Sequence, residues 1–410
     1  MAEYKGMAYL RARLKCKRRR VQVRYDHYHM KNKIADFGKM IPPDYRWITP
    51  VLGWCAKAVD VLADRIVFDG FDGGDGFRVN EILTENNSDV LFDSAVISAL
   101  ISSCCFIYIS ADSDGYPRLQ VIDGGSATGI IDPITNMLRE GYAVLDTDDR
   151  GEPTIEAYFT AEQTEICRKG EDVQIYENPA PYPLLVPMIY RPDPVRPFGH
   201  SRITRACMEL VQEALRTLRR SEISAEFYSF PQKYILGLSD SAEQMDKWGA
   251  TMSSMLAVTR DDDGNNPTVG QFQQQSMTPY SEQLKSIASL FAGETSLTLD
   301  DLGFATSNPS SYDAIRASHE NLRLTARKAQ RTFGTGFLNA VYLAACVRDK
   351  AAYTRYSFAG LTPRWLPIFE PDAAALAGVG DAILKINQAA PDYLGEKNIR
   401  RLTGMEGENG

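Results

Sequence analysis

The sequence has little of what catalytic and metal-binding proteins usually show. It holds four histidines in 410 residues, and its seven cysteines are scattered without a C-x-x-C pair. This usage excludes the common zinc patterns and favours buried free thiols in a reducing compartment. A G-x-x-x-x-G-K phosphate loop, a G-x-S-x-G elbow and an H-E-x-x-H motif are also missing. We therefore expect no catalytic residue, no metal and no cofactor.

Long apolar runs are missing as well. One uncharged stretch, residues 94–111, contains five serines and falls short of the ~20 apolar residues that a membrane-spanning helix needs. It predicts a buried helix followed by a buried strand, with the junction near Cys104. The apolar share of 44% and charged share of 24% are ordinary globular values, and the length predicts more than one domain.

Positive charge is scarce overall but concentrated in one place. The formal net charge is −8, yet eight bases and no acid lie between residues 11 and 24. Without these eight, 37 bases remain against 53 acids, a balance of −16. Such asymmetry is typical of nucleic-acid binding, but a solvated helix or a partner contact fits equally well. The acidic remainder argues against tight gripping of DNA. The run consists of Arg11, Arg13, Lys15, Lys17, Arg18, Arg19, Arg20 and Arg24.

Apolar residues at spacings of three and four predict two long helices. The first covers residues 201–228, where Ser201 can cap it and arginines 202, 205, 216, 219 and 220 occupy its other face. The second covers residues 310–348 and begins with an S-x-x-D capping box at Ser310. Gly334 and Gly336 in its middle predict a kink.

Shorter elements separate these helices. Thr49 and Pro50 predict the start of a helix that continues to Ile66. Alternating apolar residues on either side of polar turns predict strands from about 106 to 183, and a proline-rich stretch at 179–197 predicts an extended connector. Further predictions are a strand at 233–236 and helices at 242–255, 280–291 and 372–390.

Three aspartate clusters offer the hard oxygens that Mg²⁺ or Ca²⁺ prefers. They are Asp112 with Asp114, then Asp146 with Asp148 and Asp149, and finally Asp261 to Asp263. Each is followed by glycine within a few residues, as in surface turns, and we favour that interpretation. His200 beside Ser201 suggests an activated nucleophile, but the role of helix cap suffices for Ser201.

The order of these elements resembles the portal proteins of tailed bacteriophages, of the type found in phages with long non-contractile tails. Residues 25–28 resemble an early aromatic segment of that family, residues 47–71 its first wing helix, and residues 197–203 the entry to its first stem helix. The most specific match is Asn308 to Ala317, which follows the pattern N-P-x-S-x-x-A-I-R-A. Together these matches cover the chain from about Tyr25 to Leu402.

The resemblance implies an α+β, mostly helical, ring-forming portal fold. The wing is expected over residues 1–200 and 310–370, the stem over 201–228 and 280–292, the clip over 229–279, the tunnel loop over 293–309 and the crown over 371–410.

The resemblance also implies a function. About twelve copies are expected to form a ring at one capsid vertex, through which double-stranded DNA passes during packaging and ejection. The implied partners are the large terminase subunit, head-completion or adaptor proteins, and the major capsid protein or scaffold. The implied location is the virion, with the host cytoplasm during assembly and no membrane. The alternatives are a metal-dependent hydrolase that uses the aspartate clusters, and another capsid or head-completion protein.

The candidate site residues fall into two groups. The tunnel loop is expected to present Thr298, Asp300, Asp301, Thr306, Ser307 and Asn308 to the channel, without any base. The second group is expected to bridge neighbouring subunits or to contact DNA, and we favour bridging. It consists of Arg216, Arg219, Arg220, Arg316, Arg323, Arg327 and Lys328.

Overall fold

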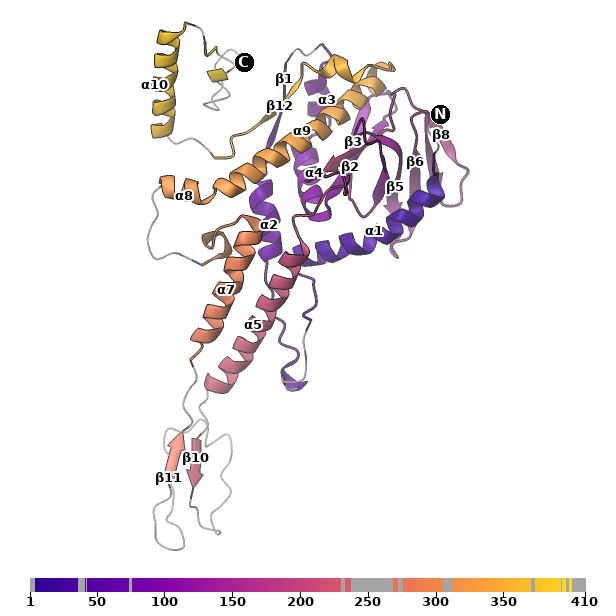
Figure 1. Cartoon of the computed structure of the whole chain (residues 1–410). Coiled ribbons are helices and arrows are strands. Elements are labelled where there is room, and N and C mark those ends of the chain that lie inside the picture. Colours follow the sequence, from indigo (N-terminus) through magenta and orange to yellow (C-terminus); the bar gives the residue numbers. More distant parts are fainter. Residues whose placement is uncertain are drawn as a thin grey trace.

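The computed structural model combines a mixed body of helices and strands with a pair of helices that projects from it (Figure 1). It describes residues 4–35, 41, 43–73, 76–229, 233–236, 268–271, 276–304, 312–369, 373–391, 393–395 and 398–399. The mixture of helix and sheet agrees with the predicted class. The predicted helix at 242–255 lies outside the described residues.

The described helices are α1 (Met7–Tyr28), α2 (Trp54–Ala63), α3 (Val79–Glu85), α4 (Ser88–Ser102), α5 (Arg205–Ser229), α7 (Thr278–Thr295), α8 (Tyr312–Ser318), α9 (Glu320–Asp349) and α10 (Ala373–Ala389), with 3-10 turns η1 (Pro43–Tyr45), η2 (Asp300–Leu302) and η3 (Arg355–Phe358). The strands are β1 (Phe68–Asp72), β2 (Cys104–Ala111), β3 (Pro117–Ile122), β4 (Ala127–Ile131), β5 (Leu138–Thr147), β6 (Pro153–Phe159), β7 (Gln163–Arg168), β8 (Gln174–Glu177), β9 (Leu185–Ile189), β10 (Lys233–Leu236), β11 (Thr268–Gln271) and β12 (Thr362–Trp365).

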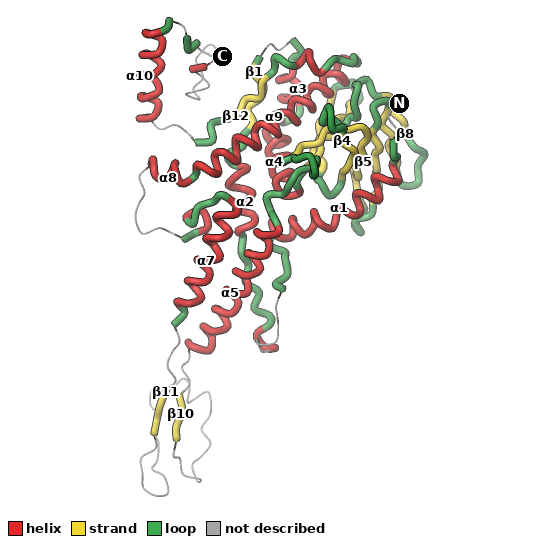
Figure 2. Tube along the Cα trace, viewed as in Figure 1, coloured by secondary structure: helices red, strands yellow, loops and turns green. Residues whose placement is uncertain are grey.

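Two larger antiparallel sheets lie in the body (Figure 2), beside the antiparallel pair β1–β12. One has the order β3-β2-β9, and the other is a meander of order β4-β5-β6-β7-β8. The strands predicted on either side of the aspartate turns form hairpins, since β2 pairs with β3 across residues 112–116 and β5 pairs with β6 across residues 148–152. The proline-rich connector is extended as expected, and it contributes β9 to the first sheet.

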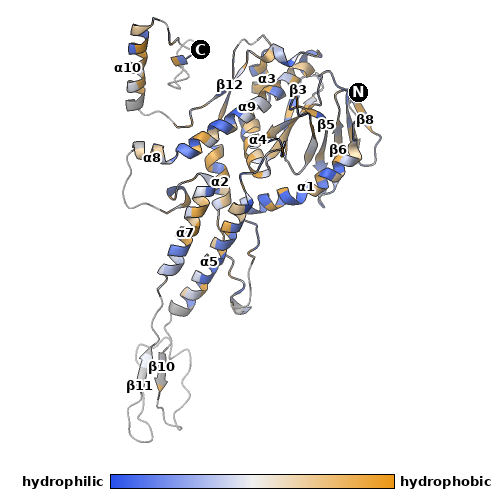
Figure 3. Cartoon of the chain, viewed as in Figure 1, coloured by the Kyte–Doolittle hydropathy of each residue, from blue (hydrophilic) through white to orange (hydrophobic). Residues whose placement is uncertain are grey.

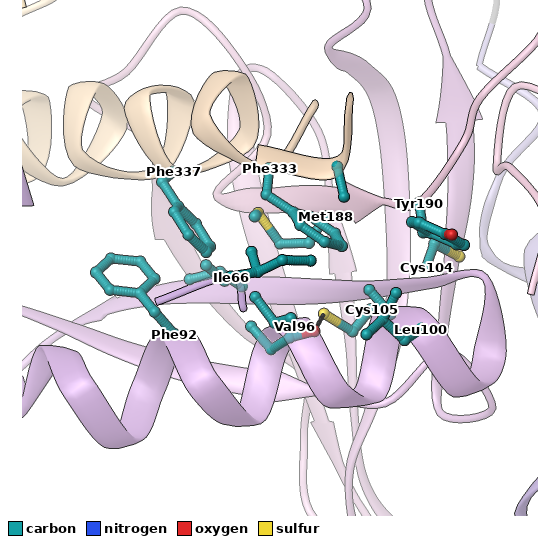
Figure 4. Packing of buried hydrophobic residues seen from close by; sticks show 14 of the residues in the cluster. Ile66, Phe92, Val96, Leu100, Cys104, Cys105, Met188, Tyr190, Phe333 and Phe337 are labelled. Atoms are coloured by element: carbon teal, nitrogen blue, oxygen red, sulfur yellow. Dashed lines mark hydrogen bonds between the residues drawn. The ribbon is translucent and has the colours of Figure 1, made fainter. Parts of the chain in front are cut away.

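The main core lies where α4 and α9 pack on the first sheet (Figure 4). Phe92 from α4 packs against Phe337 from α9 with ring centroids 4.1 Å apart and the rings tilted by 46°, and Met188 of β9 is buried beside them. The predicted buried helix and strand over 94–111 are confirmed as α4 and β2, which meet at Ser103. Burial of these apolar side chains is the main favourable term in the stability of the body.

A smaller core forms where α1 crosses the meander. Leu10 and Leu14 pack against Tyr142 and Tyr158 of the sheet. Glu140 of β5 is buried and accepts hydrogen bonds from the backbone N–H groups of residues 5 and 6, at 2.9 and 3.0 Å, just before the first turn of α1. A carboxylate at this end favours the helix, because the first N–H groups lack partners and the helix dipole is positive there.

Two predicted helix starts are wrong. The helix expected from Thr49 and Pro50 begins at Trp54 instead, after Gly53, and the residues before it are loop. The first long helix begins at Arg205, and its cap is Thr204, whose Oγ1 accepts from the N–H of Cys207 at 3.2 Å. Ser201 and Thr204 are both residue types that can cap a helix, so the spacing of apolar residues alone does not decide at which of them the helix begins.

The second long helix is divided at His319 into α8 and α9. Helix α9 runs through Gly334 and Gly336, the predicted kink, without a break. Both glycines are buried, and a Cβ on Gly334 would lie 2.8 Å from Cγ of Pro363, while one on Gly336 would lie 2.6 Å from Sδ of Met188. Close approach of neighbouring elements therefore explains why glycine stands at these positions. The starting residue Ser310 lies outside the described residues.

Hydropathy varies strongly between elements (Figure 3). The visible side of α1 is mostly hydrophilic, whereas apolar residues are frequent along α10. Among the helices that the structure describes, none combines the length and apolar character required to cross a bilayer.

Candidate functional site

The projecting helices α5 and α7 form an antiparallel pair (Figure 1). Side-chain hydrogen bonds join them near both ends. Ser224 Oγ lies 2.9 Å from the hydroxyl of Tyr280, and Thr204 Oγ1 donates to Glu294 Oε1 at 3.0 Å. The predicted returning helix is confirmed, and at Thr278–Thr295 it is longer than expected. The two strands β10 and β11 pair beyond the far end of this helix pair.

Arg202 fastens the pair to the body. Its side chain is only 6% exposed, and its guanidinium donates to the backbone carbonyl of Ala58 in α2 at 3.1 Å and to that of Thr295 at the end of α7. The prediction that Arg202 lies on the outer face of the first long helix is therefore wrong. Because a buried cation needs acceptors, two helix carbonyls serve as its partners.

The chain segment before α2 covers one side of α5. Gln212 accepts from the N–H of Ala35 at 2.8 Å, and Arg216 donates to the Ala35 carbonyl at 3.3 Å. Arg219 donates to the carbonyl of Arg46 at 2.5 Å and is buried within the single chain, with 5% of its surface exposed. Arg220, the next residue, is exposed. Of these three predicted bases, Arg220 is thus the most open to a partner.

The predicted tunnel loop is partly described. Residues 293–295 belong to α7, and Thr306, Ser307 and Asn308 lie outside the described residues. Asp301 accepts from the N–H and hydroxyl of Thr298 at 2.8 and 2.9 Å, and its carboxylate lies 3.2 Å from Nε2 of His319. Burial acts to raise the pKa of Asp301, but these partners outweigh it and hold the pKa below its usual value. Thr298 and Asp301 therefore join the loop to the α8–α9 break, while Asp300 is exposed.

The bases on α8 and α9 gather around an acid that the sequence analysis missed. Arg323 forms a bidentate pair with Glu320, with distances of 2.7 and 2.5 Å. The pKa of Glu320 is lowered, first by the Arg323 hydrogen bonds and then by the charges of Arg323, Arg327 and Arg316. The spacing of three residues on a helix was a signal that could have identified this pair. Arg316, Arg327 and Lys328 are exposed.

Several large apolar side chains are exposed on and beside the projecting elements. Leu290 of α7 is 63% exposed, Trp47 is 77% exposed and Val51 is 65% exposed. Leu384 and Ile386 of α10 are exposed as well. Scattered exposed apolar residues are normal, but an exposed tryptophan beside a helix pair marks a surface suited to contact with another protein.

The aspartate clusters form turns where the structure describes them. Asp112 accepts from the N–H groups of Asp114 and Tyr116, and the bond from Tyr116 is the main cause that lowers the pKa of Asp112. Asp148 accepts from the N–H groups of Arg150 and Glu152. Within the described ranges no group of three or more acids, histidines or cysteines has metal-binding geometry. Asp261 to Asp263 lie outside these ranges.

His200 has an acidic partner that the sequence analysis did not find. Its Nε2 lies 2.5 Å from Asp193, which also caps the turn that carries Val195 and Arg196. Ser201 is buried, and its hydroxyl donates to the carbonyl of Ile101 at 2.6 Å. Ser201 thereby holds the chain against α4, whereas the pair of His200 with Asp193 lies within the connector region itself.

Comparison with known proteins places the chain near phage portal proteins. It is 24% identical over 340 residues to the portal protein of Mycobacterium phage L5, covering 78% of this chain and 69% of the relative. The portal protein of Mycobacterium phage D29 matches at 24% over 341 residues, with the same shares. These two relatives confirm the resemblance expected from the local sequences. No protein-family model matches the chain.

Solved structures of gene transfer agent (GTA) particles are also similar. A chain of the neck of the native GTA particle, computed with C12 symmetry, has a TM-score of 0.48 and 14% identity, over 86% of this chain and 90% of that chain. A chain of the virion of the native GTA particle has a TM-score of 0.45 and 13% identity, with the same shares. At these TM-scores the likeness carries no conclusion about assembly.

Proposed function

We propose that this chain is a portal protein, and that copies of it form a ring at one capsid vertex of a phage with a long non-contractile tail. The ring is the channel for viral DNA during packaging and ejection. The observation that carries this proposal is the similarity to two portal proteins over 78% of the chain. The virion is the proposed location, with assembly in the host cytoplasm.

The regions of the chain then have separate tasks. The body formed by residues 1–200 and 310–370 is the wing, and α5 with α7 is the stem. The clip is 229–279, the tunnel loop 293–309 and the crown 371–410. An antiparallel helix pair that leaves a globular body, with a pair of antiparallel strands beyond it, supports this division.

Ring formation gives the exposed apolar side chains a partner. Leu290 on the stem and Trp47 beside it are exposed in the single chain, and contact with a neighbouring copy would cover them. Burial of such side chains contributes about 1.5–3 kcal/mol each when complete. Among the bases, Arg316, Arg327 and Lys328 are exposed and can pair with acids of the next copy. We favour this role over contact with DNA.

The charge balance suits a channel through which DNA slides. About twelve copies at −8 give a ring charge on the order of −100, which repels the DNA backbone and limits sticking. The tunnel-loop segment carries Asp300 and Asp301 and no base.

In this proposal the chain itself catalyses no reaction. The large terminase subunit supplies ATP hydrolysis and docks at the clip, and head-completion or adaptor proteins replace it later. The major capsid protein or scaffold holds the wing. The two aspartate clusters that the structure describes do not support a hydrolase, because Asp112 and Asp148 serve as turn residues.

Native mass spectrometry of the purified protein tests the proposal. A ring predicts a species with a mass of about twelve times the 45.7 kDa chain. A chain that stays monomeric at high concentration and under varied salt would contradict the proposal.

A further inference from the structure

Helix α1 carries eight bases between residues 11 and 24, and the first acid on it is Asp26. Two of these bases hold the helix on the body. Lys17 Nζ lies 3.1 Å from Sγ of Cys104, and Arg24 donates to the carbonyl of Ser102 at 2.8 Å. These contacts fix which side of the helix faces outward.

Two further bases have partners at the sheet. Arg11 pairs with Glu156 at 2.6 Å, and Arg18 donates to the carbonyl of Gly151 at 3.3 Å. Both partners belong to the meander on which α1 lies. These contacts add to the anchoring and reduce the capacity of Arg11 and Arg18 for other ligands.

Arg13 is half-buried, and its guanidinium lies over the ring of Phe198, 5.4 Å from the centroid. Lys15, Arg19 and Arg20 remain exposed, and we name them the α1 basic face. Among the described residues, none of the three makes a side-chain hydrogen bond or an ion pair. Packing therefore gives no reason for three cations at these positions, on a chain whose remainder is strongly acidic.

Positive charge also accumulates at the neighbouring side of the helix. The pKa of Arg24 is lowered, first by burial and then by the charges of Arg20 and Arg196. Asp193, an acid on the same connector as Arg196, is already engaged by His200 at 2.5 Å. Like charges without a compensating acid repel one another, so a bound anion would stabilise this arrangement.

The chemistry of the face favours phosphate over an acidic protein. Between Arg11 and Arg20 five exposed residues carry a positive charge and two, Ala12 and Cys16, carry none, while Tyr9 and Val23 on the same helix are 43% and 40% exposed. Positive charge therefore outweighs apolar surface here, and the cores of protein interfaces are depleted in lysine. Phosphate oxygens, in contrast, are contacted mainly by arginine and lysine.

We propose that the α1 basic face binds the phosphate backbone of double-stranded DNA, without sequence preference and outside the channel. Lys15, Arg19 and Arg20 make the contacts, and the anchored bases keep the helix in place. This site is separate from the stem and the tunnel loop. Ring formation should therefore stay intact when the site is removed, so failure of this inference leaves the proposed function standing.

The proposal is tested by measuring the affinity of the full chain for a DNA duplex of about 30 base pairs. Fluorescence anisotropy gives this affinity at salt concentrations from about 50 to 200 mM. The variant replaces Lys15, Arg19 and Arg20 with Gln. Each lost phosphate contact lowers the slope of log affinity against log salt by about 0.9, so we expect the slope to fall by about 2–3. The affinity at about 100 mM salt should fall at least tenfold.

The control replaces three exposed bases elsewhere, Arg168, Lys169 and Lys385, with Gln. It removes the same net charge and should keep the slope of the native chain. Arg19→Lys, which preserves the charge, should bind as the native chain does and excludes an effect through misfolding.

Two results would overturn the proposal. One is an unchanged slope in the triple variant with a native circular dichroism spectrum. The other is equally tight binding of poly-glutamate of matched charge through the same three bases, which would assign the face to an acidic protein.

Discussion

Replacement of Arg202 by Met should loosen the stem from the body. Arg202 is buried and donates to carbonyl oxygens of Ala58 and Thr295, on α2 and α7. Hydrogen bonds to a charged group contribute about 1.5–3 kcal/mol each, and a buried carbonyl without a donor costs a similar amount. Methionine fills much of the same space and removes the cost of burying a charge, so the net loss in unfolding free energy should be about 2–4 kcal/mol.

Equilibrium unfolding in urea, followed by tryptophan fluorescence, measures this loss. Trp54 is buried against Phe291 of the stem, with ring centroids 5.5 Å apart, and should report its release. The native chain and variants must be compared at one protein concentration, because assembly adds to apparent stability. The control is Arg205→Met, an exposed position three residues on, where we expect a change within about 0.5 kcal/mol. If Arg202→Met is as stable as that control, the anchoring role of Arg202 is wrong.

Three further predictions follow from exposed and close-packed positions. Leu290→Asp should weaken assembly at least tenfold in sedimentation velocity, because an apolar contact of about 1–2 kcal/mol is lost and a carboxylate is buried. Ile134→Asp makes an equally drastic change at an exposed sheet turn and should assemble normally. Equal assembly of both variants would show that Leu290 is not in the interface. Gly334→Ala should lower the melting temperature, because the added methyl group overpacks the site at a cost of about 1–3 kcal/mol. Gly380→Ala in α10, where a Cβ meets no atom within 4 Å, should leave the melting temperature unchanged or raise it. An unchanged melting temperature in Gly334→Ala would show that the neighbouring Pro363 can move aside. The pKa of Asp301 is depressed in the folded chain, so the stability that its carboxylate contributes is present above its unfolded pKa and is lost as pH falls from about 4 through the lower folded value. Urea titrations at several pH values should therefore show a smaller acid-induced loss of unfolding free energy in Asp301→Asn than in the native chain. Parallel curves of unfolding free energy against pH for the two proteins would contradict this.

Local signals in the sequence were enough for many elements. Alternation and glycine-containing turns predicted the hairpins after Asp112 and Asp148, because those patterns depend on residues within a few positions of one another. The uncharged stretch 94–111 predicted a buried helix and strand for the same reason. The helix pair followed from apolar spacing, which identifies the existence of a long helix better than its ends.

Contacts between distant residues were the part that could not be predicted. Arg202 resembles a surface arginine in sequence, and only the approach of α2 and α7 shows that it is buried. The break at His319 coincides with its pairing to Asp301, 18 residues earlier. The sequence around Gly334 suggests a helix kink, and only the structure shows that a side chain at this position would meet the ring of Pro363.

Electron microscopy of the purified chain tests the central claim most directly. A portal protein predicts ring-shaped particles with a central hole and rotational symmetry of about twelve, with the stem helices around the axis. Images of compact particles without a hole, at concentrations where the protein is fully assembled, would contradict the account.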